Sequence, residues 1–412
     1  MEGIKGQATL WVLVMTVILA IAGFSLPSPV LAPLMLDPAQ GMLTPQASDW
    51  SRKVWLGVIM GLYPLFQLVG SPRLGRLSDR HGRKPILMLC LIGVLAGYAL
   101  MALGIVLRSL PLLLLSRVVE GFFNGNIAIV QAMAADMSTT KTKTRNFAWI
   151  NIGMNLGWVV GPMIGGYAAV LSGDYSLAAW LAVAMTLVNL LLVWWLVPHH
   201  SPVTAIRQAP TLSSRQLLLQ PALLPYFVLT LLSYGAVQLY FTYFNVWLVE
   251  RLAWDPAQLA QASVLVSLPM MAGSWLGARF AHHWRGSSLG VVGHLLMAAG
   301  MLLFILPSHW WGLTLTFIPA GIGMSLGVLA ISVAISNRSH AEQQGQTMGL
   351  YRGLNVAGSI LAVVVGSLAL LAGTEWPFYL AALSGVVCAI GFYGLRKRAD
   401  RRQRLASCAE PG

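Results

Sequence analysis

An all-α polytopic membrane protein with twelve transmembrane helices is the fold class that this sequence predicts, on three observations. The chain is 57% hydrophobic and only 9% charged, with a mean hydropathy of +0.71, which leaves too little polar surface to cover soluble domains. Its apolar segments repeatedly reach the ~20 residues that a helix needs to cross a bilayer. Glycine and asparagine positions also recur after about 200 residues, which indicates two parallel, pseudo-symmetric six-helix bundles. Gly153 and Gly353, and Asn155 and Asn355, are such pairs.

Twelve apolar segments are long enough to be the spanning helices. In order they are residues 9–34, 54–69, 86–107, 111–137, 148–171, 177–197, 225–249, 259–281, 289–306, 312–336, 347–371 and 377–395. A cleaved signal peptide is the alternative for the first segment, but its apolar run is long and the internal repeat pairs it with the seventh. We therefore expect an N-terminal bundle over residues 1–198, a polar cytoplasmic linker over 199–221, a C-terminal bundle over 222–396 and a basic cytoplasmic tail over 397–412.

The formal net charge is +13, and the distribution of the cations along the chain predicts its orientation in the membrane. On this topology most of the 26 Lys and Arg residues lie at the side that holds both termini, and the positive-inside rule makes that side cytoplasmic. The residues on the other side are Arg52, Lys53, Arg108 and Arg251. We therefore expect a multi-pass protein of the cell membrane, in a bacterium the inner membrane. The positive charge then attracts anionic lipid headgroups and not nucleic acid.

The stretch from Gly70 to Pro85 lies between the second and third apolar segments and is highly charged. It contains one carboxylate, Asp79, and a dense set of cations: Arg73, Arg76, Arg80, Arg83 and Lys84. Such a density of charge cannot lie in hydrocarbon, so we expect a tight cytoplasmic loop. Glycine permits a backbone reversal that other residues resist, and Asp79 can bind neighbouring guanidinium groups through charge-assisted hydrogen bonds.

The same stretch carries a family resemblance. The run from Gly75 to Lys84, Gly-Arg-Leu-Ser-Asp-Arg-His-Gly-Arg-Lys, resembles G-x-x-x-D-R-x-G-R-[KR], the loop 2-3 motif of the major facilitator superfamily. An ordinary basic anchoring loop would need neither the Asp nor the Gly spacing. The resemblance implies the major facilitator fold, a central substrate site between the halves and a cytoplasmic gate. We assign to that gate Gly75, Asp79, Arg80, Gly82, Arg83, Lys84 and Asp136.

One charged pair is expected inside the membrane. Arg117 and Glu120 are three residues apart in the fourth apolar segment, which places them on one helix face. Charged groups in the bilayer interior are costly and are functional candidates by default. The segment resembles the R-x-x-x-G motif of the superfamily, which implies proton or substrate coupling. A buried ion pair that only fixes helix packing is the alternative. Carboxylates shielded from water bind protons more readily than exposed ones, so Glu120 is the expected proton carrier and Arg117 its charge partner.

The fifth apolar segment carries glycines at four-residue spacing, which present a flat ridge for close helix packing, and Pro162, which bends the helix. The segment from Gly153 to Gly166 resembles the antiporter motif G-x-x-x-G-P-x-x-G-G, and this resemblance implies a proton-coupled exporter. The motif residues are Gly153, Gly157, Gly161, Pro162, Gly165 and Gly166.

Aromatic and amide residues of the seventh and eleventh segments, with amides of the first half, fit a pocket for an amphiphilic organic molecule. Packing or a lipid-facing aromatic belt is the commoner explanation for any single aromatic residue. The expected cavity residues are Asn124, Asn151, Asn155, Tyr234, Gln238, Phe241, Asn245, Arg352 and Asn355.

The function that these features predict is proton-driven export of a small amphiphilic compound, such as a drug, siderophore or metabolite, by alternating access. A proton symporter or facilitator for uptake is the alternative within the same class, and a membrane sensor or enzyme on a transporter scaffold is the rival from another class. The sequence contains no catalytic motif and only three cysteines, so we expect no enzyme activity, no cofactor and no metal site. The expected partners are the small-molecule substrate, protons and membrane lipid, and we expect a monomer.

Overall fold

A computed structural model describes the chain over residues 2–40, 42–44, 46–137, 143–197, 214–280, 286–339 and 344–407. The chain divides into two compact units. The first contains Met1–Ile206 together with Asn245–Val264, and the second contains Arg207–Phe244 together with Leu265–Gly412. Most of the predicted linker, at residues 199–213, lies outside the described residues.

The described chain is helical throughout, apart from its turns. The helices that begin in the first unit are α1 (Glu2–Ser25), α2 (Ser28–Leu36), the 3-10 turn η1 (Pro38–Gln40), α3 (Asp49–His81), α4 (Arg83–Val106), α5 (Leu110–Phe123), α6 (Asn126–Asp136), α7 (Lys143–Ser172) and α8 (Ser176–Leu196). The later helices are α9 (Ser214–Leu218), α10 (Leu224–Leu252), α11 (Pro256–Phe280), α12 (Gly286–Phe304), α13 (Trp310–Ser336), α14 (Gln344–Ala372) and α15 (Trp376–Ser407).

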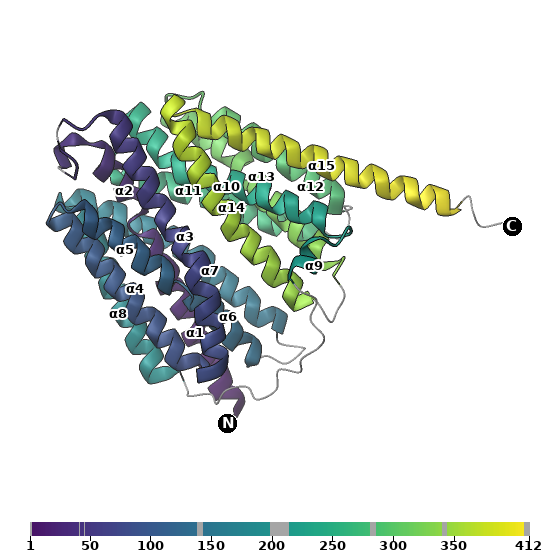
Figure 1. Ribbon diagram of the computed structural model, residues 1–412, viewed down its shortest axis with the longest axis horizontal. Coiled ribbons are helices and arrows are strands. Elements are labelled where there is room, and N and C mark those ends of the chain that lie inside the picture. The colour runs from purple at the N-terminus through teal and green to yellow at the C-terminus, as the bar shows by residue number, and fades with distance from the viewer. Residues whose placement is uncertain are drawn as a thin grey trace. The chain divides into compact units, whose positions relative to one another are not determined.

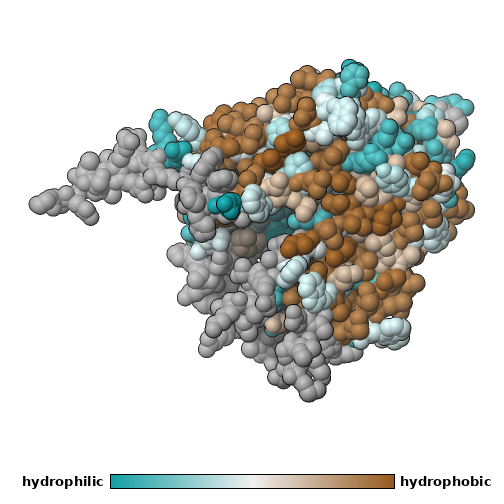
Figure 2. Space-filling view, turned by 180° about the vertical axis from the view of Figure 1, so that it is seen from behind, coloured by the Kyte–Doolittle hydropathy of each residue, from teal (hydrophilic) through white to brown (hydrophobic). Residues whose placement is uncertain are grey.

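Among the described residues, 11 helical segments are long and apolar enough to cross a membrane, and a shorter apolar helix covers Ser288–Phe304. These segments correspond in order to the twelve predicted ones, which confirms the all-α polytopic class. Apolar side chains cover much of the face seen in Figure 2. In a soluble protein so large an exposed apolar surface would be a liability, whereas in a bilayer it contacts lipid.

Two of the predicted continuous helices are broken. The first becomes α1 and α2 because Pro27 and Pro29 have no N–H, and in a continuous helix each ring would clash with the carbonyl four residues earlier. The fourth becomes α5 and α6 at Asn124-Gly125, a dipeptide that favours turns. Both breaks lie inside spanning segments.

The prediction of a loop from Gly70 to Pro85 is wrong. Helix α3 continues to His81, α4 begins at Arg83, and only Gly82 reverses the chain, with φ +93°. Gly75 lies inside α3, where an added Cβ would meet no atom within 4 Å. Charge keeps this stretch out of hydrocarbon, but it does not prevent a helix from extending out of the bilayer into water. The turn requires a glycine at Gly82 alone, since other residues are strained at a positive φ.

Within the first unit, α1 packs against α7 and α8, while α4 packs against α5 and α8. Leu13, Val17, Leu87 and Leu91 belong to the apolar core that these contacts bury. Within the second unit, α12 packs against α13 and α15. Helix α15 runs on to Ser407 and projects beyond α12 and α13 (Figure 1), so most of the predicted tail continues the last spanning helix.

Candidate functional site

The strongest candidate is an ion pair buried in the first unit. Arg117 and Glu120 lie one turn apart on α5, and the Arg117 guanidinium donates to Glu120 Oε2 at 2.7 Å. Arg117 is 4% exposed and Glu120 1% exposed. The predicted pairing on one helix face is therefore present, in an environment where solvent does not screen the charges.

The pair is incompletely satisfied. Glu120 Oε1 and Arg117 Nε are buried without a hydrogen-bond partner, and a terminal guanidinium nitrogen of Arg117 faces Met101 Sδ at 3.6 Å. Helix α4 approaches α5 closely here, since a Cβ on Gly97 would overlap the Glu120 side chain. The hydroxyls of Tyr63 and Tyr98 are electrostatic neighbours of Glu120. An unpaired buried carboxylate oxygen is costly, which makes this position a functional candidate.

The predicted cytoplasmic gate residues divide into separate contacts. Arg83 Nε binds Asp136 Oδ2 at 3.1 Å, so the start of α4 is linked to the end of α6, and Arg83 also donates to Ser78 Oγ at 2.9 Å. Lys84, only 4% exposed, donates to the carbonyl of Trp194 at 2.7 Å in the last turn of α8. A cation there neutralises the negative end of the helix dipole. Arg80 is exposed, and the Asp79 side chain lies outside what the structure describes.

The glycine ridge of α7 packs against α1. Cβ atoms added at Gly157 or Gly161 would overlap α1 atoms. Ser25 Oγ lies 3.1 Å from the Gly157 carbonyl oxygen and 2.8 Å from the Ile21 carbonyl oxygen of its own helix, and its one proton can be donated to either. Gly165 continues the ridge against the Leu26 carbonyl. Gly166 faces Pro256 and Ala260 at the start of α11 instead. The predicted close approach is thus present, and its main partner is the first spanning helix.

In the second unit, the cavity residues of α10 lie near those of α14. Tyr234 is an electrostatic neighbour of Arg352, and Tyr351 precedes Asn355 by one turn of α14. Arg352 is exposed, and Asn355 is half-buried with Oδ1 unpaired. Gln238 donates to Thr242 Oγ1 at 3.3 Å along its own helix.

Other aromatic residues of α10 belong to the core of the bundle and not to a pocket. Tyr240 is fully buried and stacks on Phe244, with edge contacts to Phe304 and Phe378. Phe241 is half-buried beside the same rings. The packing alternative therefore applies to Tyr240 and Phe244, while Phe241 lies at the edge of the cluster.

The amides assigned to the cavity in the first unit are in different environments. Asn124 is buried at the break between α5 and α6 and accepts from Gln67 Nε2 at 3.2 Å. Asn155 is exposed on α7, and the Asn151 side chain lies outside the described residues. Asn245 is buried with Oδ1 unpaired.

A polar cluster at the predicted outer end was missed from the sequence. Lys53, at the start of α3, binds Glu250 near the end of α10 at 3.1 Å, and Tyr167 accepts from Gln261 Nε2. Burial raises the pKa of Tyr175, and the neighbouring carboxylates of Asp37 and Asp255 raise it further.

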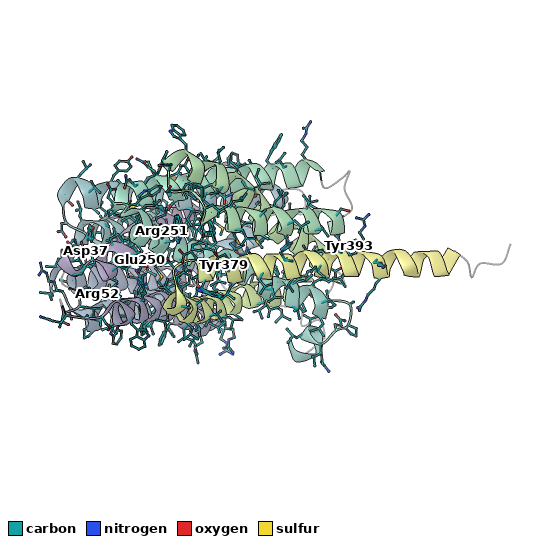
Figure 3. The ribbon with its side chains drawn as sticks, turned by 90° about the horizontal axis from the view of Figure 1, so that it is seen from above. Asp37, Arg52, Glu250, Arg251, Tyr379 and Tyr393 are labelled. Atoms are coloured by element: carbon teal, nitrogen blue, oxygen red, sulfur yellow. The ribbon has the colours of Figure 1, made fainter. Side chains whose placement is uncertain are left out.

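Figure 3 shows Asp37, Arg52, Glu250 and Arg251 toward the same end of the first unit. No local spacing signals these contacts, because the partners are far apart in the chain.

Within the described ranges, no group of three or more His, Cys, Asp or Glu residues could hold a metal ion. The site consists instead of a buried carboxylate with its cation, in a bundle of spanning helices. A buried charge of this kind in a bundle of spanning helices indicates the functional site of a polytopic helical membrane protein.

Comparison with known proteins names the family. The family model described as Major Facilitator Superfamily matches residues 13–351 and 287–408, so the chain belongs to this superfamily of membrane transporters. Curated relatives include the class B tetracycline resistance protein of Escherichia coli, 27% identical over 339 residues, which cover 79% of this chain and 82% of the relative. The class C protein of Escherichia coli is 27% identical over 381 residues, which cover 88% and 89%. The chain is thus a transporter related to tetracycline resistance proteins.

Solved structures agree on the fold. The human organic anion transporter MFSD10 (TETRAN) superposes with a TM-score of 0.68 at 22% identity, over 94% of this chain and 99% of that chain. A mutant of the nucleoside transporter NupG gives a TM-score of 0.75 at 14% identity, over 94% and 99%. At these identities the likeness concerns the fold alone.

Proposed function

We propose that this protein is a proton-coupled exporter of a small amphiphilic organic compound and that Glu120 carries the proton. The observation that carries the proposal is the unpaired, buried Glu120 Oε1 beside the Arg117 pair. The opposite oxygen is held by Arg117, so the free oxygen is where a proton can bind. Protonation removes one of two buried charges and weakens the ion pair, so the proton couples to the packing of α5 against α4.

The relationship to tetracycline resistance proteins supports export as the direction and makes tetracycline the first compound to test. Tyr234, Phe241 and Arg352, on α10 and α14, offer rings and a cation. Rings bind the apolar part of a ligand, and a cation orients its polar part. These residues are the proposed substrate contacts of the C-terminal half.

Contacts at opposite ends of the first unit are the proposed gates for alternating access. Lys53 and Glu250 act at the outer end, and Arg83 and Asp136 act at the cytoplasmic end. Each pair is partly exposed, and partly exposed ion pairs contribute little to stability. Such pairs can therefore break and re-form during a transport cycle at small cost.

The test of this function is a flux measurement in proteoliposomes of known protein orientation. We expect a pH gradient to drive accumulation of tetracycline or of another amphiphilic probe, and collapse of the gradient by a protonophore to abolish it. Protons and substrate should move in opposite directions, as reported by a pH dye inside the vesicles. Co-directional movement would make the protein a symporter, and flux insensitive to the gradient would make it a facilitator.

The membrane orientation is a separate prediction. We expect both termini in the cytoplasm, because most cations then lie inside. A reporter that is active only outside the cytoplasm should give no signal when fused after Arg404, and should give a strong signal when inserted in the α1–α3 connection at Gln40. Strong activity of the Arg404 fusion would reverse the topology.

A further inference from the structure

Polar side chains line the contact between α1, α4 and α8, inside the apolar core of the first unit. Thr16 and Asn189 are fully buried, and Tyr98 and Thr186 nearly so. Asn189 Nδ2 donates to the Thr16 carbonyl at 3.1 Å, but Thr16 Oγ1 and Asn189 Oδ1 have no hydrogen-bond partner. Buried polar atoms in native proteins are almost always satisfied, and ordered water is the usual partner where protein groups are absent.

The Tyr98 and Thr186 side chains approach each other beside Gly23 of α1. A Cβ placed on Gly23 would lie 3.6 Å from Thr186 Oγ1 and 3.8 Å from the Tyr98 hydroxyl. A methyl group at this position would therefore be in ordinary van der Waals contact with both oxygens and with the edge of the Tyr98 ring. The Thr186 hydroxyl already donates to the Ala182 carbonyl at 2.8 Å, so towards Gly23 it can only accept.

Tyr98 brings this group of side chains near Glu120. Gly97 contacts Glu120 directly, as the overlap of an added Cβ with Glu120 Cγ indicates, and Tyr98 follows it on α4. The Tyr98 hydroxyl is an electrostatic neighbour of Glu120 and Arg117. On the other side, Thr16 precedes Gly23 by seven residues, about 10 Å along a helix, towards the predicted cytoplasmic end.

We propose that Glu120, Tyr98 and water molecules held by Thr186, Asn189 and Thr16 form a proton relay between α1, α4 and α8, separate from the substrate path. A proton leaves the Glu120 carboxyl group and binds the Tyr98 hydroxyl, directly or through one water, while the Tyr98 proton passes to the water beside Gly23. Tyr98 is neutral before and after the step, and the proton continues as a hydrated proton towards the cytoplasm. Thr186, Asn189 and Thr16 position the water and carry no charge.

The relay rests on the proposed proton coupling, so the experiment measures two fluxes in proteoliposomes. Substrate accumulation driven by a pH gradient requires proton transfer, whereas exchange of labelled for unlabelled substrate at equal pH does not. For Tyr98→Phe, which keeps the ring, we expect a loss of about tenfold or more in the driven flux and an exchange rate within about twofold of wild type. Gly23→Ala should give the same pattern, because its methyl group crowds the proposed water between the Tyr98 hydroxyl and Thr186 Oγ1 without a protein contact shorter than 3.6 Å.

Matched controls lie near the middle of α15, where Tyr393 is exposed and a Cβ on Gly394 meets no atom within 4 Å. Tyr393→Phe and Gly394→Ala should leave both fluxes unchanged. Thr186→Val should reduce the driven flux, and Thr186→Ser, which keeps the hydroxyl, should restore it. If the water had only a structural role, the variants that disturb it would lower the driven flux and the exchange flux together. That result would overturn the relay.

The outcomes separate the two proposals. If wild-type protein shows no pH-driven flux, proton coupling and the relay both fail. If wild type is driven by the gradient and Tyr98→Phe and Gly23→Ala are driven equally well, the relay alone fails, and the proton reaches Glu120 through the substrate path.

Discussion

Replacement of Glu120 by Gln is expected to abolish accumulation of substrate against a pH gradient. In the wild type, Arg117 donates to Glu120 Oε2 at 2.7 Å. The glutamine keeps the size of the side chain and an oxygen that can accept this hydrogen bond, but it cannot bind the transported proton. We expect the driven flux to fall at least about 100-fold, the lower range for loss of a positioned proton-transfer group. Exchange at equal pH should survive, since it needs no net proton movement. Both rates are measured in the same proteoliposomes.

The control for this variant concerns folding. The Glu120→Gln change would leave the Arg117 charge buried without a counter-ion, and breaking a buried pair costs about 3–5 kcal/mol. The paired variant Arg117→Met with Glu120→Leu removes both charges, so it should recover thermal stability in detergent while remaining uncoupled. Glu120→Asp keeps a titratable carboxyl group and should retain partial coupling. Full gradient-driven flux in Glu120→Gln would show that another group carries the proton.

The sequence predicted the spanning helices well because apolar length is a direct physical requirement of the bilayer. It failed where two rules competed. The cations after Gly70 were interpreted as a loop, yet α3 continues to His81, because a helix satisfies its own backbone hydrogen bonds on either side of the membrane boundary. The interruption between α1 and α2 could have been found from the ring clashes of Pro27 and Pro29 in a continuous helix, which hydropathy ignores.

The candidate site was predictable where its partners are local. Arg117 and Glu120 are three residues apart, so helix geometry alone pairs them. The contacts of Lys84 with Trp194 and of Lys53 with Glu250 join residues that only the tertiary fold brings together. In the same way, the glycine spacing of α7 predicted a close helix contact, but the identity of α1 as the partner required the structure.

The second large effect is expected at that contact, for Gly161→Ala on α7. In an exposed helix this change stabilises by about 1 kcal/mol, because Ala has the higher helix propensity. At Gly161 the added Cβ would overlap Ser25 Oγ and the Ala22 carbonyl of α1. Overpacking of this kind costs about 1–3 kcal/mol. The displaced α1 would also lose the approach of Ser25 Oγ to the Gly157 carbonyl oxygen, now 3.1 Å. We therefore expect a lower unfolding temperature in detergent and a loss of pH-driven transport.

Two further glycine-to-alanine variants of this protein test whether the loss of stability and transport increases with the degree of overlap. At Gly153 the nearest α1 atom, the Val14 carbonyl oxygen, would lie 3.2 Å from the new Cβ, and at Gly394 no atom lies within 4 Å. Unfolding temperature and driven flux should therefore decrease in the order Gly394→Ala, Gly153→Ala, Gly161→Ala. Because the backbone of α1 cannot move away as a flexible side chain could, the effect at Gly161 should be the largest of the three. Equal behaviour of Gly161→Ala and Gly394→Ala would show that transport does not depend on the close approach of α7 to α1.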